Sequence, residues 1–534
     1  MKKKIYLLLS TICLLSITAC GKNDKSTENS PSVDSKPQSQ EQSPQEIEVS
    51  NSYIRYDVTD RNDYPLVGFG AQMDTDIYLP YNKMTKEDEA LWEQRIKDMN
   101  LKYTRIKYFP EYFERENDNN DPDVFDYNAP GVAPDCAEML ALYKILDLAQ
   151  KYDIKVDLSL SGCWNFFKSV DGKYNSSWLA NSTEKVKQYW VTGPTDYYEY
   201  AESISAVLKY LIEVKHYTCI WGISNISESF FNDKGVKDWN EYVEATTIIH
   251  EKLIKDGIRD KVKFIGSSEV GYNTAYFREE FGTLKDVFDV CATGNYNWDY
   301  TCENESIQNY FEEQIATMKY YGKTDYAISE FCQGKHFLDA VNKTDIDDYS
   351  AGLYIARFCI EAAKAGVTAF DHYILGDCWF TNSYVHTMGL WMYRDSNVTN
   401  PEYISWAAHP EYYFYGLVCK YTDTGAYAYK LQQTLKTEYD DPDRAIAIVA
   451  FELPDGSWTY MIANTAKEAK KVAIVNQKDG HPGTMQCYKV TESGIPEDRA
   501  CVLPESYKEV DASSGVCYLT VPANGFLVVS DKKC

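Results

Sequence analysis

The sequence predicts an α/β fold, a (β/α)₈ barrel followed by a C-terminal antiparallel β-sandwich, on three observations. From about residue 64 to residue 421, short apolar runs alternate with amphipathic stretches, as strands alternate with helices. Eight strand–helix units follow one another, which is the number that closes a barrel. The remaining residues form alternating or β-branched runs between Pro, Gly and Asp turns, which is typical of a sandwich. A doubly wound sheet is the competing fold, but no glycine-rich phosphate loop follows an early strand.

The expected elements follow from these patterns. Barrel strands are expected at residues 66–71, 103–108, 155–160, 219–224, 262–266, 290–296, 325–329 and 369–373. Helices are expected at residues 134–152, 197–215, 306–321, 347–365 and 409–421. Thr85 with Asp88 forms a capping box for another helix, and Asp238 with Glu241 begins one that ends at Gly257.

The sandwich strands are expected at residues 445–451, 459–463, 471–476, 487–490, 516–521 and 526–530. Residues 52–59 also alternate, which makes them a candidate for one more strand of this sheet. The predicted domains are therefore the barrel at residues 51–422 and the sandwich at residues 423–534.

The N-terminus predicts export and lipid attachment. Three lysines precede an apolar run at residues 5–17, which is shorter than the roughly 20 residues of a membrane-spanning helix. The run ends in Ile-Thr-Ala-Cys, which resembles a bacterial lipobox and implies a signal peptide at residues 1–20 with an acylated Cys20. An ordinary secretory signal with an incidental cysteine is the alternative. Residues 21–50 contain 14 Ser, Pro or Gln and are expected to form a disordered tether.

Composition and missing motifs exclude several classes of function. The 534 residues carry a net charge of −26, which argues against nucleic acid as a partner because binding to phosphates requires a basic surface. The sequence has no GxSxG, HExxH or P-loop motif and no Cys/His metal-ligand spacing, so we expect no metal and no cofactor. The 45 Tyr, 21 Phe and 11 Trp offer flat faces that suit sugar rings.

Candidate catalytic side chains lie where the expected barrel strands end, which is the face that carries active sites in such barrels. Glu330 ends the seventh strand in Ile-Ser-Glu-Phe, Arg105 lies on the second strand and Tyr296 ends the sixth. An arginine and a tyrosine hydroxyl beside a glutamate hold the carboxylate ionised. A structural ion pair at a strand end is the alternative interpretation of Glu330.

This layout resembles clan A of the glycoside hydrolases, and especially families 30 and 39, which append a small β-sandwich to the barrel. Ile-Ser-Glu-Phe matches the clan's nucleophile pattern, and Arg105, Tyr296 and Trp379 match its strand-two arginine, strand-six tyrosine and strand-eight tryptophan. The resemblance covers roughly residues 52–534. It implies a retaining enzyme in which Glu330 attacks the sugar while a second carboxyl group donates a proton to the leaving oxygen.

The fourth strand departs from the pattern of the clan. The clan carries Asn-Glu there, whereas Asn225 is followed by Ile226, and the nearest following glutamate is Glu228. Two residues of extended chain displace a side chain by roughly 6–7 Å, so a bulge or inserted turn is needed to restore the position. We assign Glu228 as the acid/base, with Glu269 beyond the fifth strand as its substitute. If neither serves, the chain is a non-catalytic glycan-binding protein derived from such an enzyme.

The expected substrate contacts involve polar groups for hydroxyls and aromatic rings for stacking. Besides Arg105 and Tyr296, the candidates are Asn225, Trp164, Trp298, Trp379, His372 and Glu269. Packing at the barrel rim is the alternative for the tryptophans, and a core position is the alternative for the histidine.

The sequence thus predicts a retaining glycosidase that cleaves a β-linked oligo- or polysaccharide without a cofactor. It is expected outside the cytoplasm and in contact with a bacterial membrane through its lipid anchor alone. The alternatives are the glycan-binding protein and a structural or adhesion lipoprotein, which would lack an acidic, aromatic-lined cleft.

Overall fold

The computed structural model describes residues 47–181, 191–225, 239–266, 274–296, 306–332, 348–380, 384–395, 401–434 and 445–533. The chain divides into Met1–Glu48 and Val49–Cys534, and all elements described below belong to the second unit. Within the described residues, no helix has the length and apolar character needed to span a bilayer.

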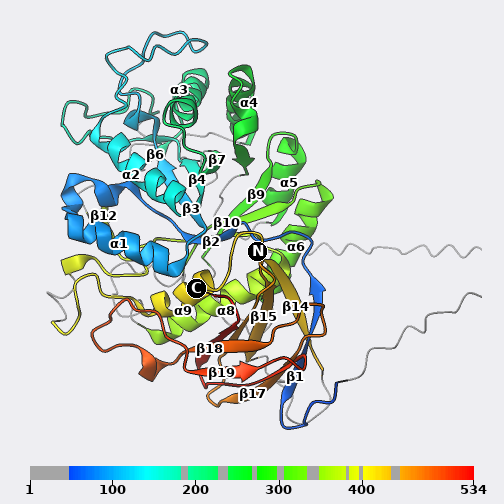
Figure 1. Ribbon diagram of the computed structural model, residues 1–534. Helices are drawn as coiled ribbons and strands as arrows, with labels where there is room; N and C mark the ends of the chain where they lie inside the picture. Colours follow the sequence, from blue (N-terminus) through cyan, green and yellow to red (C-terminus); the bar gives the residue numbers. More distant parts are fainter. Residues whose placement is uncertain are drawn as a thin grey trace, which may run out of the picture. The chain divides into compact units, whose positions relative to one another are not determined.

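Eight parallel strands close into a barrel, which confirms the predicted fold class (Figure 1). Around the barrel the order is β10, β11, β2, β3, β4, β7, β8 and β9. Their bounds are β2 (Gly68–Ala71), β3 (Tyr103–Tyr108), β4 (Lys155–Leu160), β7 (Ile220–Asn225), β8 (Lys263–Ile265), β9 (Val290–Asn295), β10 (Asp325–Phe331) and β11 (Ala369–His372). Each expected strand segment therefore overlaps one barrel strand, and the ends agree to within two residues.

The helices that alternate with these strands cover the outside of the barrel. They are α1 (Lys86–Met99), α2 (Ala137–Lys151), α3 (Tyr197–Lys209), α4 (Trp239–Lys255), α5 (Thr274–Leu284), α6 (Ser306–Tyr320), α8 (Tyr349–Ala365) and α9 (Pro410–Lys420). The predicted capping box begins α1, because Thr85 and Asp88 bond to each other's backbone N–H. The helix expected at residues 197–215 divides into α3 and a π-helical turn at Tyr210–Val214. No residue range was predicted for helix α5. Asp238, the predicted first residue of the helix that ends at Gly257, lies outside the described residues.

The C-terminal strands form one nine-stranded sheet in the order β19, β18, β21, β16, β15, β14, β1, β17 and β20. Their bounds are β1 (Ile54–Arg61), β14 (Tyr427–Gln433), β15 (Ile446–Glu452), β16 (Trp458–Asn464), β17 (Lys470–Val475), β18 (Thr484–Val490), β19 (Lys508–Asp511), β20 (Val516–Val521) and β21 (Gly525–Ser530). The expected strand at residues 52–59 corresponds to β1, which pairs antiparallel with β14 but parallel with β17. In Figure 1 this strand, in blue, lies among strands from the far end of the sequence.

Strand β15 shows how the sheet and the barrel share buried surface. Its residues Ile446, Ile448 and Ala450 pack in the sheet's own core, together with side chains of β1, β17 and β20. The alternate residues Ala447, Val449 and Phe451 pack in the core that surrounds the barrel. Both faces of this strand are therefore buried, which explains its continuous apolar sequence.

The barrel interior is layered along the strands. Near the strand starts, the small side chains of Ala292, Ala327 and Ala369 pack with Tyr103 and Val290 in a separate apolar cluster. Farther along the same strands, the inward positions become polar. This change places the ionisable groups of the barrel toward the carboxyl ends of the strands, where the candidate site lies.

Helices α8 and α9 pack closely at Gly352, and a substitution there tests this contact. A Cβ atom added at Gly352 of α8 would lie 2.3 Å from Cδ2 of the buried Phe414 of α9. Helix propensity alone would make Gly352→Ala more stable by about 1 kcal/mol. We expect the opposite sign, a loss of about 1–2 kcal/mol, because the core has no room for the methyl group.

Urea unfolding of the full chain measures this change. Gly483→Ala is the matched control, since a Cβ there meets nothing within 4 Å, and it should change stability by less than about 0.5 kcal/mol. A stabilised Gly352→Ala variant would show that the two helices are not packed this closely.

Candidate active site

Strand β3 supplies two cations to the barrel interior. Its alternate residues Tyr103, Arg105 and Lys107 face inward, while Ile106 and Tyr108 pack outward against the helices. The Arg105 side chain is completely buried. Its guanidinium donates to the Ser159 hydroxyl of β4 at 2.9 Å, which fixes its orientation.

A β-bulge in β10 turns Glu330 toward these cations. Ala327 faces inward and Ile328 outward, so regular alternation would direct Glu330 outward as well. The pairing of β10 with both neighbours shifts register after Ile328, however, as a bulge does. Beyond the shift, Glu330 faces inward and Phe331 packs outward in the helix layer.

Three groups from two parts of the barrel hold the Glu330 carboxylate. Arg105 donates to Oε1, the Lys107 Nζ lies 3.8 Å from the same oxygen, and the Tyr296 hydroxyl donates to Oε2 at 2.7 Å. Glu330 is 5% exposed, so the pairs are shielded from water. Tyr296 directly follows β9, the barrel neighbour of β10, which brings its hydroxyl within reach.

The charge state of Glu330 follows from these contacts. Burial raises the pKa of the carboxyl group, but Arg105, Lys107 and the Tyr296 hydrogen bond outweigh it and lower the pKa to about 2. Glu330 is therefore a carboxylate over the physiological pH range.

Two other carboxyl groups, those of Asp157 and Asp371, also lie near Arg105, but their pKa values are raised and not lowered. Burial raises the pKa of Asp157 to about 6, although Arg105 and Ser224 oppose the change. Burial also raises the pKa of Asp371, whose Oδ1 accepts the Arg105 backbone N–H at 3.1 Å. Arg105 and Lys107 thus act most strongly on Glu330, and the neighbouring carboxyls are left more easily protonated.

A fourth carboxyl group reaches this network through an amide. The Gln72 side chain, just beyond β2, donates to Asp74 Oδ1 at 2.8 Å, and its Oε1 lies 3.4 Å from Arg105 Nη1. Burial raises the pKa of Asp74, while Lys107 and Gln72 act against the shift. Gln72 and Arg105 thus link the ionised Glu330 to Asp74, whose pKa is raised.

Three solved structures show which proteins share this architecture. A GH30 endoxylanase from Clostridium papyrosolvens matches with a TM-score of 0.59 and 13% identity over 90% of this chain and 100% of its own. A GH39 β-xylosidase from Caulobacter crescentus matches with a TM-score of 0.56 and 14% identity over 90% and 99%. A conserved exported protein from Bacteroides fragilis matches with a TM-score of 0.62 and 12% identity over 89% and 99%.

The fold is that of clan A glycoside hydrolases of families 30 and 39. This agrees with the resemblance seen in the sequence. No protein-family model and no curated protein sequence matches the chain.

The structure places the predicted tryptophans as follows. Trp164 is 6% exposed and packs against Phe109, with ring centroids 5.5 Å apart, while its backbone N–H donates to Glu111. Trp379 is partly exposed, and Asn82 bonds to both its backbone N–H and its carbonyl. Trp298 lies outside the described residues. Trp379 is therefore the better placed of the two described rings to present a face at the surface.

The His372 side chain does not face the barrel interior. It follows the inward-facing Asp371 on β11, so it points outward, where its ring packs against Tyr415 of α9. Its two ring nitrogens are engaged by the Ile374 carbonyl at 3.2 Å and by Glu411 at 3.1 Å. The expectation that His372 contacts substrate is corrected here, because the imidazole is a buried contact between the barrel and α9.

Asn225 is the last residue of β7 and pairs with Leu160 at the end of β4, so its backbone lies at the strand ends that carry the site. The expected acid/base Glu228, its substitute Glu269 and the expected lipidation site Cys20 lie outside the described residues. Their assignments stay predictions.

Sequence reasoning missed Lys107 as a partner of Glu330. The signal was present, since Lys107 is two residues from Arg105 on the same strand and so shares its face. Asp157 and Asp371 were also missed, because a single carboxylate within an apolar strand gives no sign of the arginine that it will meet.

The pKa of Glu330 yields a prediction about acid stability. An unfolded glutamate has a pKa of about 4.3, so the native pKa of about 2 gives stability that is complete above about pH 4.3 and is lost as the pH falls toward 2. The difference in unfolding free energy between the natural protein and Glu330→Gln should therefore shrink by about 3 kcal/mol over that range.

Urea unfolding at a series of pH values checks this prediction. Glu468→Gln is the control, because Glu468 is largely exposed and its ion pair with Lys470, at 3.0 Å, lies at the surface. Its difference from the natural protein should vary by less than about 0.5 kcal/mol. A pH-independent difference for Glu330→Gln would mean that the cations do not hold Glu330 ionised.

Proposed function

We propose that this protein is a retaining glycoside hydrolase that cleaves a β-linked glycan through two carboxyl groups. The observation that carries the proposal is the buried Glu330 carboxylate, held ionised by Arg105, Lys107 and Tyr296 at the end of a barrel strand. The fold shared with GH30 and GH39 enzymes supports the same class of reaction.

In the first step, a Glu330 oxygen attacks the anomeric carbon of the sugar. The glycosidic C–O bond breaks, and its oxygen takes a proton from the second carboxyl group as the glycosyl ester forms. Arg105 and Tyr296 keep the attacking group deprotonated and restrict its rotation, so the carboxylate is aligned before substrate binds.

In the second step, the other carboxylate removes a proton from water, and the water attacks the anomeric carbon. The ester bond to Glu330 breaks, and the sugar leaves with the anomeric configuration that the substrate had. We assign this role to Glu228, three residues beyond the end of β7 at Asn225. A retaining mechanism requires its carboxyl group to lie roughly 5–5.5 Å from that of Glu330.

The substrate is proposed to be a β-linked oligo- or polysaccharide. The two enzymes with this fold are named as a GH30 endoxylanase and a GH39 β-xylosidase, so xylose-containing glycans are the first substrates to test. The partly exposed Trp379 lies on β12 (Cys378–Phe380), which follows the eighth barrel strand β11, and it offers a ring for stacking on a sugar.

A non-catalytic glycan-binding protein is the second candidate. It is favoured by one observation, the isoleucine at position 226 where the clan places its acid/base glutamate. Such a protein would keep the buried Glu330 network and would bind glycans without turnover.

We also propose that the protein is exported and held on a bacterial membrane by lipid attached to Cys20. The lysines at residues 2–4, the apolar run and the small residues before this cysteine support the proposal. The polar residues that follow would act as a tether for the folded unit.

Paired variants test the mechanism on a panel of aryl β-glycosides and β-glycans. Glu330→Gln should lower kcat by about 10⁴-fold, since no nucleophile remains. Glu228→Ala should lower kcat by about 10²–10⁴-fold for poor leaving groups, whose departure needs the acid. With an activated aryl glycoside, whose first step needs no acid, azide should restore turnover by replacing water in the second step. Glu468→Gln serves as the control and should keep full activity.

The outcomes separate the two candidates. Glycosyl azide formed by Glu228→Ala assigns that residue as the acid/base. Glycan binding without turnover in the natural protein would refute the hydrolase and support the glycan-binding alternative. Full activity of Glu330→Gln would remove Glu330 from the mechanism.

Changing Cys20 tests the anchor. Cells that produce Cys20→Ala should release the protein from the membrane fraction or retain it with an uncleaved signal, and labelling with a radioactive fatty acid should disappear. Membrane association and labelling that persist in the variant would contradict the proposal.

A further inference from the structure

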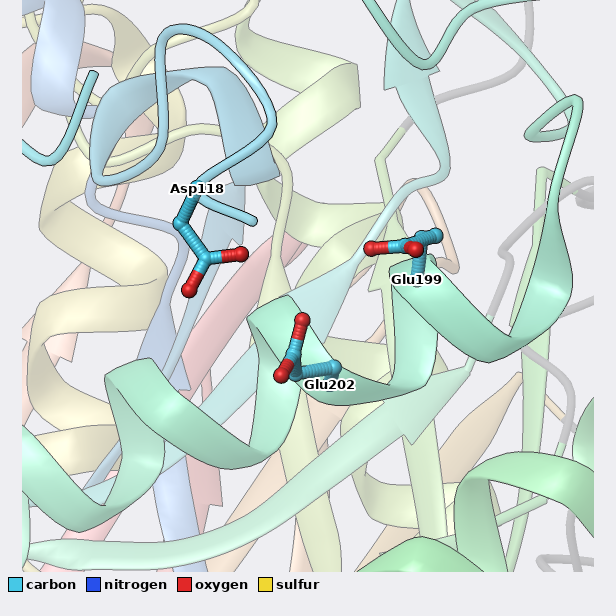
Figure 2. A group of neighbouring side chains, drawn as sticks. All are labelled: Asp118, Glu199 and Glu202. Carbon is cyan, nitrogen blue, oxygen red and sulfur yellow. The ribbon is translucent and has the colours of Figure 1, made fainter. Parts of the chain in front are cut away.

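Three carboxylates converge between the segment after β3 and helix α3. Asp118 comes from that segment, and Glu199 and Glu202 come from adjacent turns of α3 (Figure 2). One oxygen from each lies within 4.8 Å of an oxygen from the other two. Residues three apart share one helix face, which explains why both glutamates reach Asp118.

Glu202 is buried without a partner. The residue is 1% exposed, and neither carboxylate oxygen has a hydrogen-bonding partner among the described residues. Glu199 is 7% exposed, and its Oε2 is likewise buried and unpaired within the described chain. A buried, unpaired carboxylate is costly unless a cation or hydrogen-bond donor compensates it.

A fourth carboxyl group lies beside these three. Glu114 is completely buried, and its Oε1 accepts the backbone N–H of Asp118 at 3.3 Å. Its Oε2 is buried and has no hydrogen-bonding partner in the part of the chain that the structure describes.

Protein cations do not neutralise this cluster. No lysine or arginine among the described residues forms an ion pair with Glu114, Asp118, Glu199 or Glu202. The Lys252 ammonium acts electrostatically on Glu202, but it pairs with Asp256 at 3.3 Å and donates to the Asp123 carbonyl. The lysines and arginines among the described residues therefore bring no paired positive charge to the cluster.

The donor atoms and their spacing fit one kind of ligand. All are carboxylate oxygens, which hard divalent cations prefer. Oxygens on opposite sides of Ca²⁺ lie about 4.6–5.2 Å apart and those across Mg²⁺ about 4.0–4.2 Å apart, given metal–oxygen distances of about 2.3–2.6 and 2.0–2.1 Å. The three carboxylate oxygens lie within 4.8 Å of one another, so one Ca²⁺ ion can contact all of them. Seven of the ten residues at positions 117–126 are Asp or Asn, so further oxygens are close in sequence.

We propose that Asp118, Glu199 and Glu202 bind one Ca²⁺ ion, with Glu114 as the adjoining carboxylate. The ion joins the segment after β3 to α3, which already contact each other through a 3.1 Å hydrogen bond from the Tyr127 hydroxyl to the Ala206 carbonyl. Helix α3 leads into β7, whose end carries Asn225. The site thus fixes the position of two segments at the mouth of the barrel, and it does not depend on the proposed function.

Cysteine and histidine spacing predicts no metal in this chain. That reasoning does not address oxygen ligands. The cluster joins residues 118 and 199–202, which only the fold brings together.

Sensitised terbium luminescence on the full chain tests the site. Tb³⁺ replaces Ca²⁺ at oxygen sites, and the Trp178 indole donates to the Glu114 carbonyl at 3.1 Å, so it lies close enough to transfer excitation. We expect Tb³⁺ emission on excitation of tryptophan, displaced by Ca²⁺ with a stoichiometry of one. Trp178→Phe should weaken the emission while calorimetry still shows Ca²⁺ binding.

Binding-site variants and a charge-matched control complete the experiment. Glu202→Gln should lower Ca²⁺ affinity at least tenfold, and Asp118→Asn is the second variant if the first fails to fold. Glu468→Gln removes the same charge far along the chain and should bind as the natural protein does. Saturating Ca²⁺ should raise the Tm of the natural protein by about 3–5 °C and leave that of Glu202→Gln unchanged.

Three results would overturn the proposal. These are the absence of Ca²⁺ binding by calorimetry, equal affinity of the natural protein and Glu202→Gln, and Mg²⁺ binding as tight as Ca²⁺ binding.

Discussion

The ion pair between Arg105 and Glu330 is the constraint on which the rest of the site depends. A completely buried guanidinium is stable only beside carboxylates, and a buried carboxylate stays ionised only beside cations. Each group therefore stabilises the charge of the other, and removing Arg105 leaves Glu330 with only the Lys107 ammonium, at 3.8 Å, as a cation among the described residues. Ser159, Gln72 and Tyr296 then take positions that serve this pair.

The pair also explains why the neighbouring carboxyls differ from Glu330. Arg105 and Lys107 supply positive charge to a space that holds Glu330, Asp157 and Asp371. The register shift in β10 gives Glu330 the closest approach to both cations, and so the lowest pKa of the three. A one-residue irregularity of the backbone thus decides which carboxyl group is the nucleophile candidate.

Much of the fold was predictable from the sequence, whereas the site was predictable only in part. The barrel strands follow from apolar runs, and Arg105, Tyr296 and Glu330 follow from their positions at strand ends. The bulge was not predictable, since nothing in Ile-Ser-Glu-Phe distinguishes a bulged strand from a regular one. His372 was misplaced because alternation along β11 was not applied to it. The acidic cluster joins distant segments, and local patterns carry no trace of it.

The place of β1 in the sheet has a consequence for how the chain folds during synthesis. This strand leaves the ribosome before the whole barrel, yet its neighbours β14 and β17 begin only at Tyr427 and Lys470. At 5–20 residues per second, β1 spends roughly 20 s or more as an unpaired strand with two open edges. The nine-stranded sheet cannot form completely until β14 and β17 have been made and have paired with β1. A nascent chain of this kind is therefore expected to need chaperones until synthesis ends.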